Sequence, residues 1–437
     1  MSGTDTKLPL NSAFAGVITL LLALVALPQQ ATGQIWADAT VVTVYVDATS
    51  TAATPDGTTW ALAYTNLQDA LLAVDAAPPT PGDPVQIWVA SGTYAPDVAD
   101  VGTLPAACTT DATDCTFAII DNVAIYGGFN GSETSFADRD VDANQVVLTG
   151  DLATSTTAFA KTVVTCATGC GVTPTDAAEV DGVTIKKGSG GSTGGAVLVD
   201  DGDLTLNLGT AFQNSATDGG AMHVSGATGG IDISITNSRF YRNDASNDGG
   251  ALFLGNPTAA STLTIENTIF SGNDAVGDGG AISSLLANWA VTAMNNTFED
   301  NSAVDGGAII FALGTLDIDN QIFFGNTASG AGNSINNGTA AAVDLDNSLL
   351  DDSGCPTATV VVTCTGGNIF SADPLFTNAT LEDFTLRAGS RAINNGTSTG
   401  APSADIVGNT RPYNSGAVDM GAYESQVGLD FGDLPTG

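Results

Sequence analysis

The sequence predicts an all-β fold, a single-stranded, right-handed parallel β-helix in which coils of chain stack into a solenoid. Three observations predict it. Gly-Gly-Ala followed by an aliphatic residue or Met recurs at intervals of 25, 30, 30 and 27 residues, and a second signature, Asn-x-x-Phe-x-x-Asn-x-Ala, alternates with it. Between the signatures, hydrophobic residues alternate with mostly polar ones, which is typical of short strands with one buried face. Repeats of this length without helix-length segments between them indicate a solenoid. The five copies of Gly-Gly-Ala begin at Gly194, Gly219, Gly249, Gly279 and Gly306.

The second signature predicts the inside of each coil. Because side chains alternate across a strand, we expect each Phe to point inward and to stack on the Phe of the next coil. Gly and Asn tolerate the backbone of sharp turns, and stacked Asn side chains form an amide ladder with about 4.8 Å between copies. At about three strands per coil, we expect about fourteen coils over about 65 Å. The intact copies carry Phe240, Phe270, Phe298 and Phe323, and Ala211 takes the Phe position in an earlier copy.

The N-terminal residues predict export. Lys7 precedes an apolar run, residues 14–27, that is too short for a comfortable membrane span. Ala31 and Gly33 are the small residues that a signal peptidase needs, so we expect residues 1–33 to be a cleaved signal peptide. No later segment is long and apolar enough to cross a bilayer. The chain is therefore expected to be secreted or to lie at the cell surface, associated with the outer membrane.

The remaining chain is expected to have four parts. Residues 34–130 form an N-terminal cap with a short helix and the first coils, and residues 131–370 form the β-helix repeats. Residues 371–425 form a C-terminal closing module, because exposed edges of parallel sheets promote aggregation and both ends need to be covered. Residues 426–437 are a tail or the start of a further module.

Composition and charge exclude two classes of protein. The 437 residues include 10 Lys and Arg against 47 Asp and Glu, a formal net charge of −37. So few cations do not neutralise a track of phosphates, which excludes a nucleic-acid binder. A hydrophobic content of 43% excludes a disordered acidic tail. Charge of this size favours solubility in a salty medium, or repulsion between neighbouring copies, and it repels acidic polysaccharides.

The six cysteines fall into three close pairs. An even number in an exported chain indicates disulfides, and proximity favours one short loop for each pair. Zinc is the alternative, but the spacings are irregular and the single histidine, His223, is not near any pair in the sequence. The expected disulfides join Cys108 to Cys115, Cys166 to Cys170, and Cys355 to Cys364.

Residues 190–330 resemble the repeats of chlamydial-type polymorphic outer-membrane proteins, because Gly-Gly-Ala-[Ile/Leu/Val] and Phe-x-x-Asn recur together. The resemblance implies an exported right-handed parallel β-helix. The flanks resemble those of other exported bacterial β-helix proteins. The opening runs through Gly57-Thr-Thr-Trp60, Leu67-Gln-Asp-Ala70 and Ile87-Trp-Val-Ala-Ser-Gly-Thr-Tyr94. The segment from Asp373-Pro-Leu-Phe376 to Val418-Asp-Met-Gly-Ala-Tyr423-Glu424 is similar to the choice-of-anchor module, which implies that it closes the helix.

Arg239, Arg242 and His223 are the candidate catalytic residues. Many parallel β-helices are polysaccharide lyases, which need a base such as Arg, Lys, His or Tyr. Arg239 should point outward and Arg242 should lie at a turn, because Phe240 between them points inward. His223 falls in an outward-facing column and is expected to be exposed. The alternatives are that the two arginines neutralise nearby aspartates and that His223 has no catalytic role.

Four aspartates precede the Gly-Gly pairs and should form a column, with like charges about 4.8 Å apart. Either the carboxylates turn into solvent or accept hydrogen bonds from N–H groups of the turns, or they form a row of calcium sites with oxygen ligands from adjacent coils. The four are Asp218, Asp248, Asp278 and Asp305.

Regular repeats without a convergent acid–base cluster favour an exported, non-catalytic surface protein with an adhesive or envelope-structural role. The expected partner is a cell-surface or extracellular glycan or protein. No cofactor is expected, with calcium as the alternative described above. A polysaccharide lyase or related carbohydrate-active enzyme is a second hypothesis, and a carbohydrate-binding module of a longer polypeptide is a third. Fold alone does not separate the three.

Overall fold

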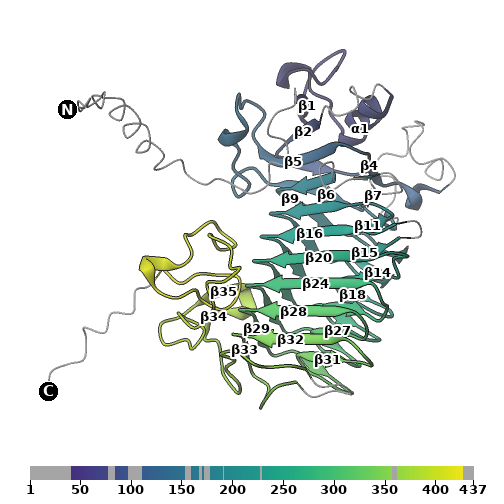
Figure 1. Cartoon of the computed structure of the whole chain (residues 1–437). Coiled ribbons are helices and arrows are strands. Elements are labelled where there is room, and N and C mark those ends of the chain that lie inside the picture. The colour runs from purple at the N-terminus through teal and green to yellow at the C-terminus, as the bar shows by residue number, and fades with distance from the viewer. Residues whose placement is uncertain are drawn as a thin grey trace, which may run out of the picture. The chain divides into compact units, whose positions relative to one another are not determined.

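The computed structural model describes residues 41–76, 84–96, 111–152, 159–166, 170–171, 178–189, 191–226, 229–356 and 362–426. The predicted signal peptide, Cys108 and residues 427–437 lie outside the described residues. Over these residues the fold is mostly β, a parallel β-solenoid with one short α-helix, α1 (Leu67–Ala76), near its N-terminal end (Figure 1). This confirms the predicted fold class.

Each complete turn of the solenoid contains four strands. In one turn, β16 (Asp232–Thr236) is followed by β17 (Arg239–Tyr241), then by the two-residue β18 (Asp244–Ala245) and by β19 (Leu252–Leu254). Each strand pairs in parallel with its counterpart in the turns before and after it. We expected three strands in each turn and the structure has four. The fourth is formed by the residues that follow the second Asn of the signature.

The paired strands make four parallel sheets within the described residues, named here by their number of strands. The ten-stranded sheet contains β1 (Val42–Val46), β2 (Val85–Ala90), β5 (Val123–Phe129), β8 (Ala178–Asp181), β12 (Leu204–Asn207), β16, β20 (Ser261–Glu266), β24 (Trp289–Met294), β28 (Thr315–Asp319) and β32 (Ala342–Asp346). The nine-stranded sheet contains β3 (Gly92–Tyr94), β6 (Val146–Thr149), β9 (Val183–Lys186), β13 (Thr210–Phe212), β17, β21 (Ile269–Ser271), β25 (Thr297–Glu299), β29 (Ile322–Phe324) and β33 (Leu349–Leu350).

The other two sheets follow in each turn. The six-stranded sheet contains β10 (Gly191–Thr193), β14 (Ser215–Asp218), β18, β22 (Asp274–Ala275), β26 (Ser302–Ala303) and β30 (Thr327–Ala328). The eight-stranded sheet contains β4 (Phe117–Ile119), β7 (Val164–Cys166), β11 (Val197–Asp200), β15 (Met222–Ser225), β19, β23 (Ile282–Ser284), β27 (Ile309–Phe311) and β31 (Ile335–Asn337).

The solenoid has fewer turns than expected. All four strands are present in six successive turns, from β8 to β31. The estimate of about fourteen coils was wrong because the early turns carry long excursions and residues 371–426 do not form solenoid coils. A separate antiparallel pair, β34 (Phe376–Asn378) and β35 (Asp383–Leu386), lies in that last segment. Short 3-10 helices occur at Trp60–Leu62, Ala112–Asp114, Phe136–Asp138, Ala379–Leu381 and Tyr413–Ser415.

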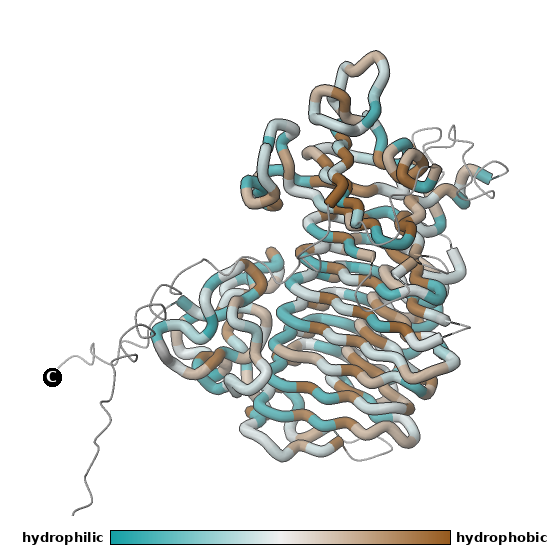
Figure 2. Tube along the Cα trace, turned by 45° about the horizontal axis from the view of Figure 1, so that its top comes forward, coloured by the Kyte–Doolittle hydropathy of each residue, from teal (hydrophilic) through white to brown (hydrophobic). Residues whose placement is uncertain are grey.

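Two columns of identical side chains hold the turns together, as predicted. The phenylalanines of the signature are buried and stack face to face, with ring centroids 4.9–5.0 Å apart. At the next corner, the buried Asn side chains form an amide ladder, in which each Nδ2 donates to the Oδ1 of the next turn at 2.8–3.1 Å. Figure 2 shows hydrophobic residues recurring at matching places in successive coils. The ladder consists of Asn214, Asn243, Asn273, Asn301 and Asn326.

The Gly-Gly pairs form the corner between the six-stranded and eight-stranded sheets. The first glycine has a left-handed backbone, as at Gly249 with φ of 69°. A Cβ on the second glycine, Gly250, would clash with the carbonyl oxygen of Gly280 in the next turn. Glycine is therefore required twice, once for the turn and once for the close approach of two coils.

Helix α1 and a group of aromatic rings lie at the N-terminal end of the solenoid. Helix α1 buries Leu67, Leu71 and Val74 in the main hydrophobic core and packs against β1 and β4. On the outer side of the ten-stranded sheet, a cluster of aromatic rings covers the first strands. It consists of Tyr45, Trp60, Trp88, Tyr126, Phe129 and Phe136.

The C-terminal segment, residues 371–426, lies along the side of the solenoid rather than across its end (Figure 1). Outward-facing residues of the nine-stranded sheet, including Tyr241 and Ile269, form a second hydrophobic core with Phe376, Phe384 and Met420. The expectation that this module closes the end is therefore wrong: it packs there because these outward positions are apolar. The last turn is instead extended by the bridges of Asp344 with Thr363 and of Leu349 with Ile369.

Side chains at the edge of the solenoid fix the position of this segment. The Nδ2 atoms of Asn267, Asn295 and Asn320 donate to the carbonyl oxygens of Ala404 (2.9 Å), Asp419 (2.8 Å) and Thr397 (2.8 Å), respectively. Within the segment, the fully buried Arg411 pairs with Glu424 (Nε to Oε2, 3.1 Å) and donates to Oδ1 of Asn267 at 2.6 Å.

Two of the three predicted disulfides join described residues, Cys166 to Cys170 and Cys355 to Cys364. Cys115 is also disulfide-bonded. Among the described residues, there is no helix with the length and hydrophobicity needed to cross a membrane.

Candidate functional site

His223 is buried, not exposed as predicted. It lies on β15 in the outward-facing column of the eight-stranded sheet, where Phe253 of the next turn stacks on its ring with centroids 5.0 Å apart. Only 7% of the residue is accessible to solvent, and its Nδ1 atom has no hydrogen-bond partner. Burial lowers the pKa of His223, against the opposing effect of Asp218. The imidazole therefore lies beneath a neighbouring ring and does not meet solvent as a surface base.

Arg239 and Arg242 both contact the C-terminal segment. Arg239 faces outward from β17, as predicted, but its side chain is half-buried there and hydrogen-bonds to Tyr423. Arg242 forms an ion pair with Glu382 (Nη2 to Oε1, 2.8 Å). The alternative that the two arginines neutralise nearby aspartates missed these partners, which lie far away in the sequence. His223 belongs to a different sheet, so the three candidates are not neighbours on one strand or sheet.

The four aspartates before the Gly-Gly pairs do form a column, and their carboxylates accept hydrogen bonds from the backbone. One carboxylate oxygen of each accepts a hydrogen bond from an N–H group of the next turn. Burial, together with neighbouring carboxylates, raises the pKa of Asp248 and of Asp278. Within the described ranges, no three His, Cys, Asp or Glu residues are grouped so that they could hold a metal ion. The N–H donors are Asp248 (3.3 Å), Asp278 (2.8 Å), Asp305 (3.2 Å) and Ala331 (2.6 Å).

We expect removal of calcium to leave the thermal stability of the protein unchanged, because N–H groups of the turns already neutralise part of the charge on this column. The measurement compares the melting temperature by circular dichroism before and after dialysis against EDTA. A lower melting temperature in EDTA that calcium restores, and magnesium does not, would contradict this expectation.

A buried polar network lies under the aromatic cluster on the ten-stranded sheet. The hydroxyl of Tyr126 donates to Oε2 of Glu179 at 2.6 Å, and Arg139 forms an ion pair with Asp181. Asn207 donates to the second oxygen of Asp181 at 2.8 Å. Glu179 is inaccessible to solvent, and its Oε1 atom has no partner. Burial raises the pKa of Glu179 to about 8, although the bond from Tyr126 opposes the shift.

This network predicts a stability that falls with rising pH. Between the ordinary pKa of 4.5 and about 8, the folded chain keeps a proton on Glu179 that the unfolded chain has lost, so stability declines across that range. Replacing Glu179→Gln should remove the share of the decline that Glu179 contributes, about 2–4 kcal/mol between pH 5 and pH 8.5. The share that other buried carboxyls such as Glu299 contribute should remain. Urea unfolding of both proteins at the two pH values measures it, with Asp232→Asn, an exposed carboxylate on the same sheet, as the control. Parallel pH profiles for wild type and Glu179→Gln would disprove the assignment.

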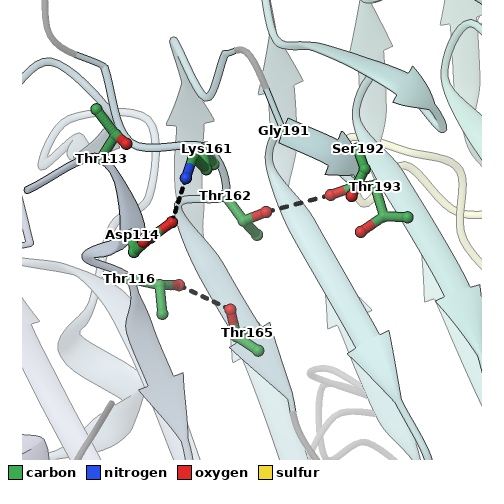
Figure 3. Close-up of a pocket in the computed structure, with 9 residues that line it drawn as sticks. All are labelled: Thr113, Asp114, Thr116, Lys161, Thr162, Thr165, Gly191, Ser192 and Thr193. Carbon is green, nitrogen blue, oxygen red and sulfur yellow. Dashed lines mark hydrogen bonds and ion pairs between the residues drawn. The ribbon is translucent and has the colours of Figure 1, made fainter. Parts of the chain in front are cut away.

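Two surface hollows lie beside the six-stranded sheet. The first, which we call the threonine hollow, has a volume of about 200 Å³, and six of its nine lining residues are Thr or Ser (Figure 3). Three of its six hydroxyls bond to one another or to the backbone: Oγ1 of Thr116 lies 2.8 Å from Oγ1 of Thr165, and Thr162 donates to the carbonyl of Thr193 at 3.2 Å. The hydroxyl of Thr113 donates to a carboxylate oxygen of Asp111 at 2.7 Å. Lys161 and Asp114 form an ion pair at its rim.

The second hollow, which we call the corner hollow, has a volume of about 350 Å³ and lies at the corner between the nine-stranded and six-stranded sheets. Its lining brings together Lys187, Arg242, Asp244, Gln213 and the half-buried ring of Phe159. This hollow gathers cations, a carboxylate and an aromatic ring, so it combines polar groups with an apolar surface, as ligand pockets do. Of the residues that the sequence singled out as catalytic candidates, only Arg242 lies here.

Sequence reasoning missed Lys187 and Gln213 because their turns carry incomplete copies of the signature. The structure shows how they belong to the repeat. Gly188 donates its N–H to Oδ1 of Asn214 at 3.0 Å, so it occupies the ladder position one turn earlier. Lys187 therefore precedes a ladder position, just as Gln213 and Arg242 do.

Comparison with known proteins adds no family to these observations: no family model matches the chain, and no curated protein matches its sequence. The resemblance of the repeats to polymorphic outer-membrane proteins, and of the C-terminal segment to the choice-of-anchor module, therefore stays a prediction.

Proposed function

We propose that the chain is an exported, non-catalytic surface protein with an adhesive or envelope-structural role, which uses its solenoid as a scaffold for a polar binding surface. The observation that carries this proposal is that each candidate catalytic side chain contacts another side chain of the folded chain. His223 lies under Phe253, Arg239 contacts Tyr423, and Arg242 pairs with Glu382. An ion-paired cation and a buried imidazole are poor bases for removing a proton from a polysaccharide.

Export is supported by the disulfides, which persist in oxidising compartments. Expression of the full chain in a Gram-negative bacterium, followed by fractionation and N-terminal sequencing, tests this part of the proposal. The expected product begins at Gln34 and is found outside the cytoplasm. A chain that stays in the cytoplasm with Met1 intact would contradict export.

The absence of catalysis is tested with the purified exported protein. Incubation with polygalacturonate, alginate and neutral polysaccharides should release neither unsaturated nor reducing ends, while the same protein should bind saturably to intact cells or to their extracted surface glycans. Turnover of any of these polymers that is lost in an Arg242→Ala or His223→Ala variant would favour the polysaccharide lyase hypothesis instead.

The corner hollow favours the third hypothesis, a carbohydrate-binding module of a longer polypeptide, as the closest alternative. A module and a complete adhesin would share the same binding surface. They differ in what the surface is attached to, so the size of the protein found on cells by immunoblotting with an antibody to the solenoid separates them.

A further inference from the structure

The geometry points to the corner hollow as a binding site for an uncharged glycan segment, with Gln213, Arg242 and Phe159 as its main contacts. This inference rests on the proposed function and gives it a location and a class of ligand. It follows from three features of the hollow: a row of side chains at one corner position, a second polar row with an aromatic ring beside it, and a balance of charge that favours no anion.

The first feature is a row of long polar side chains that the solenoid repeats from turn to turn. Lys187, Gln213 and Arg242 occupy the same corner position in three successive turns, each with a left-handed backbone (φ of 62°, 54° and 52°). The amide ladder that begins at the next residue fixes this spacing, because Asn214 donates to Asn243 through both its backbone N–H and its Nδ2 at 3.1 Å. The rise of about 4.8 Å per turn is close to the length of one sugar residue in an extended glycan.

The second feature is a row of short polar side chains beside the first. Ser189 and Ser215 lie in neighbouring turns with their hydroxyl oxygens 3.0 Å apart, and Asp244 pairs with Ser215 in the strand register of the next turn. Asp244 is exposed, so its carboxylate is open to solvent. Phe159 supplies a partly exposed ring at the side of the hollow, and aromatic rings pack on the apolar faces of sugars.

The third feature is the charge of the hollow. Lys187 pairs with Asp151 (Nζ to Oδ2, 2.7 Å), and Arg242 pairs with Glu382 at 2.8 Å. Each cation is thus already neutralised by a carboxylate, and Asp244 adds a further negative charge. An acidic polysaccharide would therefore meet no net attraction here, and the −37 charge of the chain would repel it. Hydroxyl groups, in contrast, both donate and accept, so they fit a surface of ion pairs, an amide and serines.

The same corner position offers a way to remove side chains without straining the backbone. Glycine occupies it naturally in two later turns, at Gly272 (φ of 61°) and Gly325 (φ of 70°). Gln213→Gly and Arg242→Gly therefore keep the backbone that the turn requires. Asp300→Gly changes the same position outside the hollow, where Asp300 has φ of 50°, and is the matched control.

The test is isothermal titration of the exported protein with neutral hexasaccharides (cellohexaose, xylohexaose, mannohexaose and N-acetylchitohexaose) and with hexagalacturonate. We expect at least one neutral hexasaccharide to bind more tightly than hexagalacturonate. Gln213→Gly, Arg242→Gly and Phe159→Ala should each weaken that binding about tenfold or more, and Asp300→Gly should change it less than about twofold. Circular dichroism of every variant verifies that the solenoid is folded.

The inference is overturned if none of the neutral hexasaccharides binds, if hexagalacturonate binds more tightly, or if the variants of the hollow bind as wild type does. These outcomes leave export and the absence of turnover untouched, since the experiments on those two properties do not depend on this hollow. Conversely, turnover of a polymer would defeat the proposed function even where the hollow binds it.

Discussion

Replacing Asn273→Ala should lower the free energy of unfolding by about 3–6 kcal/mol, because it breaks the amide ladder at its centre. Asn273 is inaccessible to solvent; its Nδ2 donates to the carbonyl of Phe240 (2.9 Å) and to Oδ1 of Asn301 (2.9 Å). Its Oδ1 accepts from both the backbone N–H and the Nδ2 of Asn243, at 3.1 Å and 2.9 Å. Alanine removes the side-chain bonds to all four partners. Asn301 Oδ1 still accepts from the backbone N–H of residue 273 and Asn243 Nδ2 still donates to the carbonyl of Ala211, but the backbone N–H of Asn243 loses its acceptor. A buried group left without a partner costs about 1–3 kcal/mol, and each lost bond adds about 0.5–1.5 kcal/mol.

Urea unfolding followed by circular dichroism measures the loss, and hydrogen exchange locates it. The backbone amide of Asn243 should exchange faster in the variant, because its acceptor is gone. Asp274→Asn, which changes the neighbouring exposed residue, should alter stability by less than about 0.5 kcal/mol. If Asn273→Ala were as stable as this control, the ladder would contribute nothing to the fold.

Replacing Phe270→Ala should cost about 4–6 kcal/mol. The ring of Phe270 is fully buried and stacks on two others, with centroids 5.0 Å from Phe240 and 4.9 Å from Phe298. Truncation removes both stacking contacts and leaves a cavity that the rigid turns above and below are poorly able to fill.

Phe270→Leu is the matched variant for this prediction. The column already accepts aliphatic residues, since Leu350 pairs with Phe323 at one end and Ile185 pairs with Ala211 at the other. We expect Phe270→Leu to cost less than about 2 kcal/mol in the same urea experiment. Equal losses in the Ala and Leu variants would show that ring stacking, rather than the volume of the side chain, dominates this column.

The features that the sequence predicted are those that repeat. The Phe column, the amide ladder and the Gly-Gly corner could be read from the sequence because stacking places equal residues in equal surroundings, so one physical reason explains every copy. The disulfides of Cys166 with Cys170 and of Cys355 with Cys364 could be predicted because each closes a short loop.

The features that the sequence did not predict depend on contacts between distant parts of the chain. Alternation alone says that Tyr241 and Ile269 face outward, and it does not say that Phe384 covers them. An apolar residue beside the inward Phe was nevertheless a usable signal, because a solvated strand would alternate with polar residues there. The burial of His223 escaped prediction for a different reason. Phe253 occupies the same column in the next turn, but alternation alone does not say that its ring covers the imidazole.

The candidate site was harder to predict than the fold. Arg242 could be singled out because cations are rare in this chain, but its partner Glu382 and the Phe159 that lines the same hollow lie outside the repeats. Lys187 and Gln213 join the site only through their shared corner position, which becomes visible once Gly188 is recognised as a ladder position. In this solenoid the candidate site lies where the side chains differ from turn to turn, and the repeat pattern does not predict such residues.

The lateral docking of the C-terminal segment constrains where a whole repeat can be duplicated within this chain. Ala404 and Thr397 of the segment accept hydrogen bonds from Asn267 and Asn320, which lie in different turns. The segment therefore fits only a stack with a fixed number of turns between these two residues. Duplicating one repeat ahead of Tyr241 would lengthen the stack and leave the hydrogen bonds of the segment with Asn267 and Asn320 intact. The same duplication between Asn267 and Asn320 would move their amides about 4.8 Å farther apart and detach one end.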